Sequence, residues 1–573
     1  MRSRRVFLYG TVALWLLVTL LALGAMYRLW WTRERALYAG RSPDEQRRIV
    51  LERAGIPART LDVARAADAG WPLDGNYEDD GAEVTLSYFK YLVLPRIPVD
   101  SSARRIEERG SEYALQGVEP GSSGAPRPFS TVPPTPRGLI LSALALLGLA
   151  AGSTRHGFSL PEGLSAAVLA LAIAGALAQG VFGSFAPAGY ATCLLGAAGW
   201  AWFAAGRRRA RESRPANHEP ASRADVWIGR AALAILAASA VWALLMAAAV
   251  VPDDWDAWAQ WGPKAKILAV SGGALAGVGE FVPGSGDYPL LWPATWAFSG
   301  WCAGGWEEQW SKGWGAIFLW LAAWQLQIVA VRSGQRRGPA WLFAAAFASM
   351  PAVPLVASWG YAEAPFWLAL ACATGRLLAW QAGGRRAELW RAGLFMAGAA
   401  CTKNEGLLFA TLGAAWVAAA GRKWRDVAAV GLPVALCAGA WKLYVAVAMD
   451  VTNHSLAALG GGFPAPAEWL RRLAAAGGYV GRQWLDVQQW NVVLPAALAV
   501  AGWLAIRGGA RQRFGLLLPF GLLGGLLVVV LMYGDNWLWQ LGVAWNRLTI
   551  QFMAVLLPVL AAGLCSCPGR PER

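Results

Sequence analysis

The sequence Pro252-Asp253-Asp254-Trp255-Asp256-Ala257-Trp258 opens a polar stretch, residues 251–314, that lies between two strongly apolar runs. Carboxylates directly beyond a membrane-length run are costly to remove from water, so we expect them to face water or a cavity. Tryptophan suits the headgroup level of a bilayer, because its ring is apolar and its N–H is a donor. The acids and tryptophans either mark the membrane boundary or, with Lys264 and Lys266, form an interfacial site for an anionic lipid and a nucleophile.

The composition places the chain among membrane proteins. Of its 573 residues, 56% are hydrophobic, and the mean hydropathy is +0.37. Apolar runs of about 20 residues, long enough to span a bilayer as a helix, recur along the chain. We therefore predict an all-α polytopic membrane protein with about 14 transmembrane helices. Interfacial loops on the outer face and an N-terminal extracytoplasmic segment complete the predicted architecture.

The net charge of +15 does not indicate nucleic-acid binding, because the basic residues cluster in short loops between apolar runs. Positive charge in short loops is the signal that keeps those loops cytoplasmic. The clusters lie at residues 207–211, 385–386, 422–423 and 511–513. The seven cysteines lack metal-ligand spacing and the three histidines are isolated, so neither a zinc site nor a histidine-based triad is expected.

The order of polar and apolar segments divides the chain into parts. Residues 1–26 are typical of a signal-anchor helix with a cytoplasmic N-terminus, and residues 27–137 of a soluble extracytoplasmic segment. Within that segment, residues 34–54 and 101–112 are predicted to be helical. The rest divides into additional transmembrane helices with a basic cytoplasmic loop (138–226), a larger membrane domain (227–565) and a cytoplasmic tail (566–573).

Counting apolar runs from a cytoplasmic start places every basic cluster inside and the acidic stretch outside. The runs after the first are about 138–153, 161–182, 186–206, 227–251, 313–332, 339–357, 365–381, 390–401, 407–420, 427–448, 491–506, 514–533 and 548–564. The runs 390–401 and 407–420 form a hairpin, because basic loops flank both of them. Its tip carries Lys403 and Glu405, which would need partners or an anionic ligand at membrane depth.

Four stretches stand out by their order and their common predicted side. They are Asp253-Asp254-Trp255-Asp256, Asp287-Tyr288-Pro289-Leu290-Leu291, Tyr361-Ala362-Glu363-Ala364-Pro365 and Thr402-Lys403-Asn404-Glu405-Gly406. Together they resemble the GT-C class of membrane glycosyltransferases, which contains protein O-mannosyltransferases, the aminoarabinose transferase of lipid A and rhizobial-type lipopolysaccharide sugar transferases. The resemblance covers residues 227–565, where Arg547 matches the late arginine of the class more loosely. The class usually places its catalytic acid just after its first helix, whereas here four helices and a soluble segment come before the helix that leads to the acids. The usual Asp-Glu pair is also replaced by Asp-Asp-Trp-Asp.

The resemblance implies an inverting hexosyl or pentosyl transferase of cell-envelope polysaccharide biosynthesis. It would lie in the bacterial cytoplasmic (inner) membrane, with its active site on the extracytoplasmic face. The donor would be a polyprenyl-phosphate-linked sugar, and the acceptor a glycan, lipid or protein. Asp254 or Asp256 would act as the base with Asp253 as a helper, a role typically worth about 100- to 10,000-fold in rate. In a helix Asp254 and Asp256 would diverge by about 200°, so the two cannot share one role.

The leaving phosphate would need fixed cations. Lys403 is the first choice, followed by Lys264, Lys266 and Arg547. The alternatives to phosphate binding are structural: Lys264 and Lys266 could contact lipid headgroups, and Lys403 could fix the depth of the hairpin in the membrane. The predicted substrate-binding set is completed by Asp287, Tyr288, Glu363 and Glu405. Glu363 could equally complement the dipole of the helix that it begins.

Hard cations favour carboxylate oxygens, so a divalent metal at the three aspartates is chemically reasonable. Members of the class that use a lipid monophosphate generally work without one, and no cofactor is expected. Two other functions compete with glycosyl transfer: a polytopic transporter or flippase, and a non-catalytic partner in polysaccharide assembly. A transporter is expected to show repeated halves with interrupted helices, and the sequence shows no internal repeat.

Overall fold

The computed structural model describes most of the chain from residue 133 onward and parts of the segment before it. The described residues are 41–53, 106–109, 112–115, 133–212, 222–252, 254–269, 286–421, 423–449, 464–534 and 536–565, with Thr19, Leu21, Gly24, Arg28 and Tyr38. They are almost entirely helical, and their only strands form one short antiparallel pair, β1 (Ile106–Arg109) with β2 (Glu112–Leu115). The predicted all-α class is therefore confirmed for the described residues.

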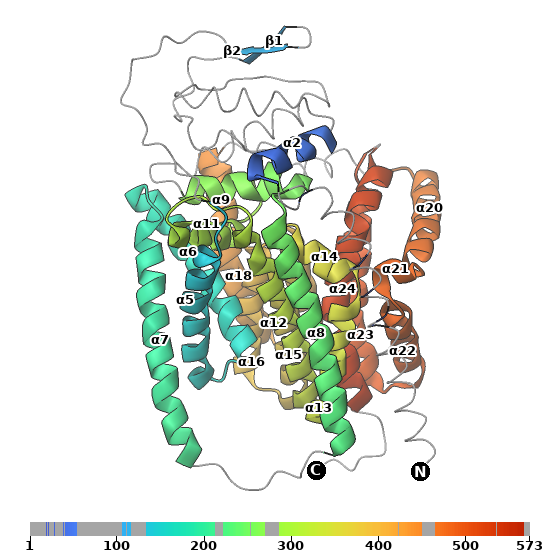
Figure 1. Ribbon diagram of the computed structural model, residues 1–573. Coiled ribbons are helices and arrows are strands. Elements are labelled where there is room, and N and C mark those ends of the chain that lie inside the picture. The colour runs from blue at the N-terminus through green and yellow to red at the C-terminus, as the bar shows by residue number, and fades with distance from the viewer. Residues whose placement is uncertain are drawn as a thin grey trace.

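The helices follow the order of the predicted apolar runs (Figure 1). Those before the acidic stretch are α2 (Pro43–Arg53), α5 (Arg137–Ser153), α6 (Leu160–Phe182), α7 (Ala186–Glu212) and α8 (Arg223–Ala249). Those up to the hairpin are α9 (Gly262–Ala269), α11 (Leu291–Ala303), α12 (Trp314–Arg332), α13 (Arg337–Ser349), α14 (Ala352–Ser358), α15 (Glu363–Gly383), α16 (Arg386–Ala400) and α17 (Glu405–Gly421). The last are α18 (Trp424–Tyr444), α20 (Pro466–Trp484), α21 (Val487–Trp490), α22 (Val493–Arg507), α23 (Ala510–Leu531) and α24 (Trp537–Cys565).

Short helical turns of tighter or wider winding join these helices. Two are 3-10 turns, η2 (Thr154–His156) and η4 (Trp310–Gly313), and two are π-helical, η3 (Asp256–Trp261) and η5 (Val445–Met449). The predicted interfacial loops thus contain helical structure: η3, α9 and α11 in the first, and α20 and α21 in the second. The segment of η3 carries one of the predicted catalytic acids.

Seven of the described helices are long and apolar enough to cross a membrane, or up to eight if the bent pair α13 and α14 is one span. The chain is thus a membrane-embedded α-helical protein. The bend between α13 and α14 is 64°, and it falls at Pro351. Proline has no N–H to donate and clashes with the preceding turn, which explains the break.

The N-terminal segment differs from its prediction. Residues 101–112 were expected to be helical, but every described residue of that range belongs to β1 or to the start of β2, which extends to Leu115. In the other predicted helix, α2 begins at Pro43, where Ser42 and Glu45 form reciprocal capping hydrogen bonds. The tail 566–573 and all of the predicted signal anchor except Thr19, Leu21 and Gly24 lie outside the described residues.

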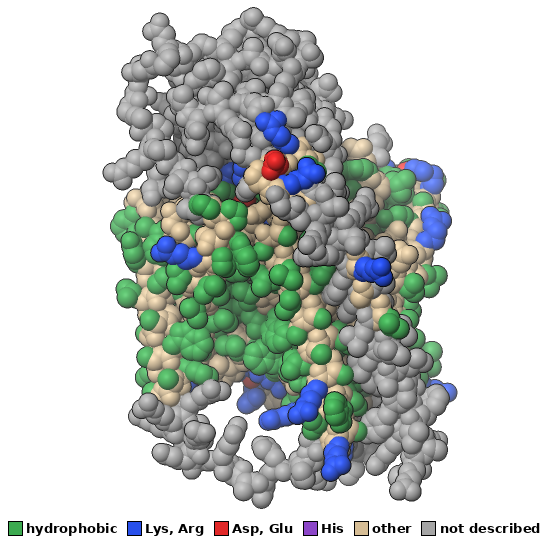
Figure 2. Space-filling model, viewed as in Figure 1, with side chains coloured by type: hydrophobic (Ala, Val, Ile, Leu, Met, Phe, Trp, Pro, Cys, Tyr) green, Lys and Arg blue, Asp and Glu red, His purple; other side chains and the backbone are tan. Residues whose placement is uncertain are grey.

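The molecule has two chemically different ends. α2, α9 and α11 lie at one end, here called the α9 end, while the turns after α12, α15 and α22 lie at the other (Figure 1). The second end, called the arginine end, carries Arg332, Arg336, Arg337, Arg385, Arg386, Arg507, Arg511 and Arg513. Between the ends, hydrophobic side chains cover the middle of the face that Figure 2 shows, with Lys and Arg side chains above and below.

A buried ion network ties the helices together at the arginine end. Glu162, in the first turn of α6, pairs with Arg332 of α12 and Arg376 of α15. Arg376 also pairs with Glu388 of α16, and both Glu162 and Arg376 are buried. Buried charges are stable only when paired in this way. The helices of residues 138–226 are therefore joined to the larger membrane domain that follows them.

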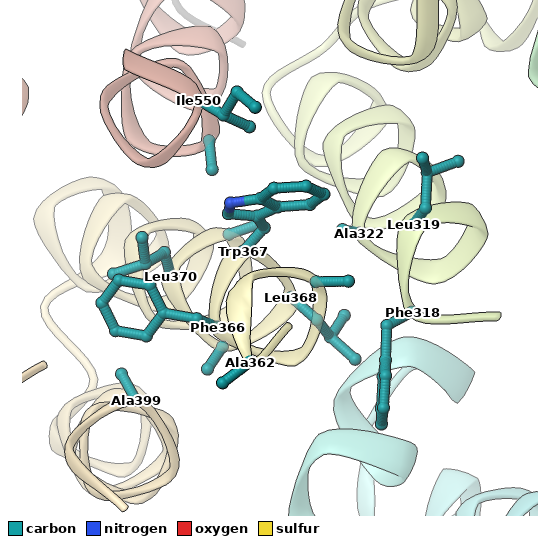
Figure 3. Close-up of a cluster of buried hydrophobic side chains, with 14 of the residues drawn as sticks. Phe318, Leu319, Ala322, Ala362, Phe366, Trp367, Leu368, Leu370, Ala399 and Ile550 are labelled. Carbon is teal, nitrogen blue, oxygen red and sulfur yellow. The ribbon is translucent and has the colours of Figure 1, made fainter. Parts of the chain in front are cut away.

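The helix α15 runs through the centre of this bundle. Its side chains at Phe366, Trp367 and Leu368 are all buried, and they contact α12, α16 and α24 (Figure 3). Residues 364–371 of α15 are all apolar. Because neighbouring helices enclose α15, the position of its first residue, Glu363, is fixed by packing rather than by a loop.

Candidate functional site at the α9 end

The acidic stretch lies directly after α8, at the α9 end. Asp254 accepts a hydrogen bond from the Tyr361 hydroxyl, and Asp256, the first residue of η3, forms an ion pair with Arg547. The two carboxylates thus contact different partners, in keeping with their expected divergence. Asp253 lies outside the described residues.

Arg547 connects Asp256 to a second acid. It lies on α24, with its guanidinium 5.1 Å from the Tyr361 ring centroid and its Nη1 3.8 Å from Glu363 Oε1. Glu363 is fully buried in the first turn of α15. A carboxylate in a first turn also complements the helix dipole. Glu363 therefore combines the structural role considered from the sequence with a place in the charged site.

Lys403 lies at the tip of the α16–α17 hairpin and is only 5% exposed. Its Nζ lies 2.6 Å from Glu363 Oε1 and 3.1 Å from Glu405 Oε1, so two carboxylates share the ammonium. The tip is also held by a backbone hydrogen bond of 3.0 Å from the Leu291 N–H to the Cys401 carbonyl. The result is a continuous line of alternating charges, here called the charge line: Asp256, Arg547, Glu363, Lys403 and Glu405.

A second cluster shares the hairpin tip with the charge line. Asp287 Oδ2 accepts hydrogen bonds from Asn404 Nδ2 and from Lys442 Nζ, both at 2.8 Å. Lys442 also donates to Asn404 Oδ1 at 2.7 Å. Because Asn404 follows Lys403 directly, movement of the hairpin tip would disturb both clusters. The structure thus places Asp287 beside the hairpin tip, where it contacts Asn404 and a lysine of α18.

Lys264 and Lys266 do not face lipid headgroups, because both side chains are buried. Lys264 Nζ donates to the Tyr288 carbonyl at 3.1 Å and lies 5.8 Å from the Tyr288 ring centroid. Lys266 Nζ lies 5.6 Å from the ring centroid of Trp306. Burial lowers the pKa of the Lys264 ammonium to about 7, although Asp287 acts to raise the pKa. Lys264 therefore titrates near neutral pH.

Replacing Lys264 with methionine is expected to change how stability depends on pH. The pKa of Lys264 is near 7 in the folded protein and 10.5 in the reference state, so between these values the unfolded chain holds more protons. Wild-type stability should therefore rise with pH in that window, by about 1 kcal/mol per pH unit, whereas K264M lacks this contribution. Melting temperatures of the purified protein between pH 7 and 9 should show the advantage of K264M shrinking. Parallel curves for K264M and wild type would contradict the assignment, with K423M as the exposed control.

Two members of the site were not identified from the sequence. Tyr361 appeared only within a motif, yet its hydroxyl bonds Asp254 and its ring lies against Arg547. Lys442 lies alone in the apolar run of α18, and a lone charge in such a run is itself a signal, because its burial is costly. A search for isolated charges inside predicted helices would have found Lys442.

The site offers acceptors as well as cations. Within the described residues, Glu363 Oε2 and Glu405 Oε2 are buried and have no hydrogen-bond partner. These oxygens can accept hydrogen bonds from the hydroxyls of a ligand. Among the described residues, no group of three or more His, Cys, Asp or Glu side chains is arranged to hold a metal ion.

Comparisons with known proteins identified no relative of this chain. No family model matches the chain, and no curated protein or solved structure matches it significantly.

Proposed function

We propose that this protein is a GT-C-type membrane glycosyltransferase, with the full set of about 14 spans expected from the sequence. It transfers a sugar from a polyprenyl-phosphate donor to a glycan, lipid or protein acceptor at the α9 end. The observation that carries the proposal is the charge line with Asp254 beside it. Arginine-rich loops favour the cytoplasm, which supports our proposal that the α9 end lies on the extracytoplasmic face of a bacterial inner membrane.

In the proposed reaction, Asp254 takes the proton of the acceptor hydroxyl as its oxygen attacks the anomeric carbon. The bond from that carbon to the phosphate oxygen breaks, and the electron pair leaves with the phosphate. Attack from the side opposite the leaving group inverts the anomeric centre. Arg547, which is 17% exposed, is the cation we assign to the developing phosphate charge. Both Arg547 and Lys403 contact two carboxylates, but the Lys403 side chain is only 6% exposed, so the more accessible Arg547 replaces Lys403 as the first choice.

Other residues of the site fit the binding of a sugar. The unpartnered oxygens of Glu363 and Glu405 are suited to accept hydrogen bonds from sugar hydroxyls. Tyr361 orients Asp254 through its hydroxyl and offers an aromatic ring beside Arg547. The proposed reaction needs no cofactor, because proton transfer and charge stabilisation come from side chains.

The distribution of charge favours this proposal over a transporter or flippase. A transport pathway would be lined by polar groups through the membrane. Here the charge line lies at the α9 end and the Glu162–Arg376 network at the arginine end. In α15, which carries Glu363 of the charge line and Arg376 of that network, the apolar residues 364–371 lie between the two charged residues. The partner role in polysaccharide assembly has no comparable feature in its favour.

The proposal is tested by mass analysis of surface glycans and lipid-linked sugars from cells with and without this protein. We expect one sugar to be missing from a surface glycan and its polyprenyl-phosphate donor to accumulate. Membrane vesicles given the donor on both faces separate the alternatives, since a flippase is then no longer needed for transfer. Unchanged glycans in cells that lack the protein would remove the proposal.

A further inference from the structure

The segment before the membrane domain contacts the start of the acidic stretch through one side chain. Gln46, on α2, is only 5% exposed. Its Oε1 accepts hydrogen bonds of 3.1 Å from the Val251 N–H and from Gln309 Nε2. Its Nε2 donates to the carbonyls of Tyr38 and Arg41 at 3.2 and 3.3 Å. Every hydrogen-bonding atom of the Gln46 side chain is therefore engaged.

The N–H that Gln46 binds belongs to a peptide group that is held on both sides. The carbonyl of the same peptide group, that of Val250, accepts a hydrogen bond of 2.8 Å from Lys312 Nζ. Val251 is fully buried, and Lys312 is 1% exposed. A peptide group clamped at both its donor and its acceptor cannot rotate, so the direction in which the chain leaves α8 is fixed. Asp254 follows only three residues later.

Lys312 links this peptide group to the partner of Asp254. Gly360 has a positive φ of 85°, and a Cβ placed there would lie 2.9 Å from Lys312 Cδ. The Lys312 stem therefore runs directly over the Gly360 backbone, next to Tyr361. The Gly360 carbonyl accepts a hydrogen bond of 2.7 Å from Trp292 Nε1, which fixes it to α11. Gln46, Lys312 and Gly360 thus form a support that sets Asp254 and Tyr361 relative to each other.

An ion pair and a set of buried apolar side chains also hold the N-terminal segment on the membrane domain. Arg47 pairs with Glu308, which directly precedes Gln309. Tyr38, Ile49 and Val50 are buried in the same hydrophobic core as Val251. These contacts place α2 on the membrane domain as part of its packed structure.

From this geometry we propose that Gln46 is a positioning residue for the proposed catalytic base, Asp254, and that α2 of the N-terminal segment thereby completes the active site. The first part concerns the Val250–Val251 peptide group and stands on structure alone. The second part, an effect on sugar transfer, rests on the proposed function. Gln46 contacts no reacting group, so it should affect the turnover rate and leave donor binding unchanged.

The test compares Gln46→Ala with Glu45→Gln, Arg47→Gln and Gln46→Glu in the full-length protein. The Glu45 side chain is exposed and hydrogen-bonds Ser42 in the N-terminal cap of α2, a bond that glutamine can also accept, so E45Q is the matched control on the same helix. R47Q weakens the docking anchor alone, and Q46E keeps an acceptor for the Val251 N–H. Hydrogen exchange by mass spectrometry on the peptide that covers Val251 and Asp254 gives a readout independent of activity.

We expect Q46A to increase deuterium uptake in that peptide, with E45Q at the wild-type level. Q46E should lie between Q46A and the wild type, because its carboxyl keeps an acceptor for the Val251 N–H but, when ionised, cannot donate to the carbonyls of Tyr38 and Arg41. In the transfer assay, kcat should fall by up to about 100-fold in Q46A with KM for the donor unchanged, the scale of a misplacement near 1 Å. Wild-type uptake in Q46A would overturn the inference, as would R47Q loosening the peptide as much as Q46A. If the wild type transfers no sugar at all, the proposed function fails, and the exchange data still decide the role of Gln46.

Discussion

Replacing Asp254 with asparagine is expected to lower the rate of sugar transfer by about 100- to 10,000-fold, the usual contribution of a general base. Asparagine keeps the volume of the side chain and an oxygen that can accept the Tyr361 hydroxyl hydrogen bond, but it cannot take a proton. The fold should therefore be preserved while the chemistry is lost. The rate is measured in membrane vesicles with a polyprenyl-phosphate-linked sugar and a membrane glycan acceptor.

Asp256→Asn is the matched comparison, because Asp256 belongs to the same stretch but faces a cation. In D256N, Arg547 loses its ion pair with Asp256 and keeps the longer one, of 3.8 Å, with Glu363. We therefore expect weaker donor binding and lower stability rather than loss of the chemical step. If D256N loses the chemical step and D254N retains it, the base is Asp256. Unchanged transfer in both variants would remove the enzyme hypothesis.

Replacing Lys403 with methionine is expected to destabilise the protein by about 3 to 5 kcal/mol, the cost of leaving a buried charge without its partner. Both Lys403 and Glu363 are buried, and their atoms lie 2.6 Å apart. In K403M, Glu363 would keep only the more distant Arg547, at 3.8 Å. The loss is measured as the shift in the denaturation midpoint of the purified protein.

The double variant K403M/E363Q completes a double-mutant cycle, which measures the interaction energy between Lys403 and Glu363 apart from their contacts with other residues. Removing both charges should cost less than the sum of the two single losses, because neither partner is then left buried and unpaired. The pair of Arg385 with Glu388, in which the arginine is 77% exposed, provides the control, and R385A should cost less than about 1 kcal/mol. A K403M protein as stable as wild type would show that Lys403 does not hold the charge line together.

Membrane helices could be predicted from the sequence because their signal is local. A run of apolar residues must form a helix in a bilayer, since its backbone has no other hydrogen-bond partners there. The predicted run 313–332, for example, corresponds to α12 (Trp314–Arg332). The hairpin of α16 and α17 was also predicted, because the basic residues on both sides leave one place for its tip. The short β1–β2 hairpin was missed, since four-residue strands give almost no periodic signal.

The candidate site could be predicted only in part. The charges of the motifs were identified because acids and lysines at membrane depth are costly and therefore conspicuous. Their pairing depends on which helices are neighbours, and this information is not local. Lys403 was expected to bind phosphate, but it lies between Glu363 and Glu405. Gln46 could not have been found, because a glutamine in a polar helix looks like any solvated residue until Val251 is placed beside it.

The separation of the two charged ends has a consequence for bioenergetics. Residues 364–371 of α15 offer no ionisable group along this stretch, so they provide no relay on which a proton could hop from one end to the other. The proton that Asp254 is proposed to accept therefore has no path along this stretch of α15 to the arginine end. A transfer reaction whose proton returns to the water at the α9 end would neither consume nor dissipate the membrane potential, and its energy would come entirely from the donor bond.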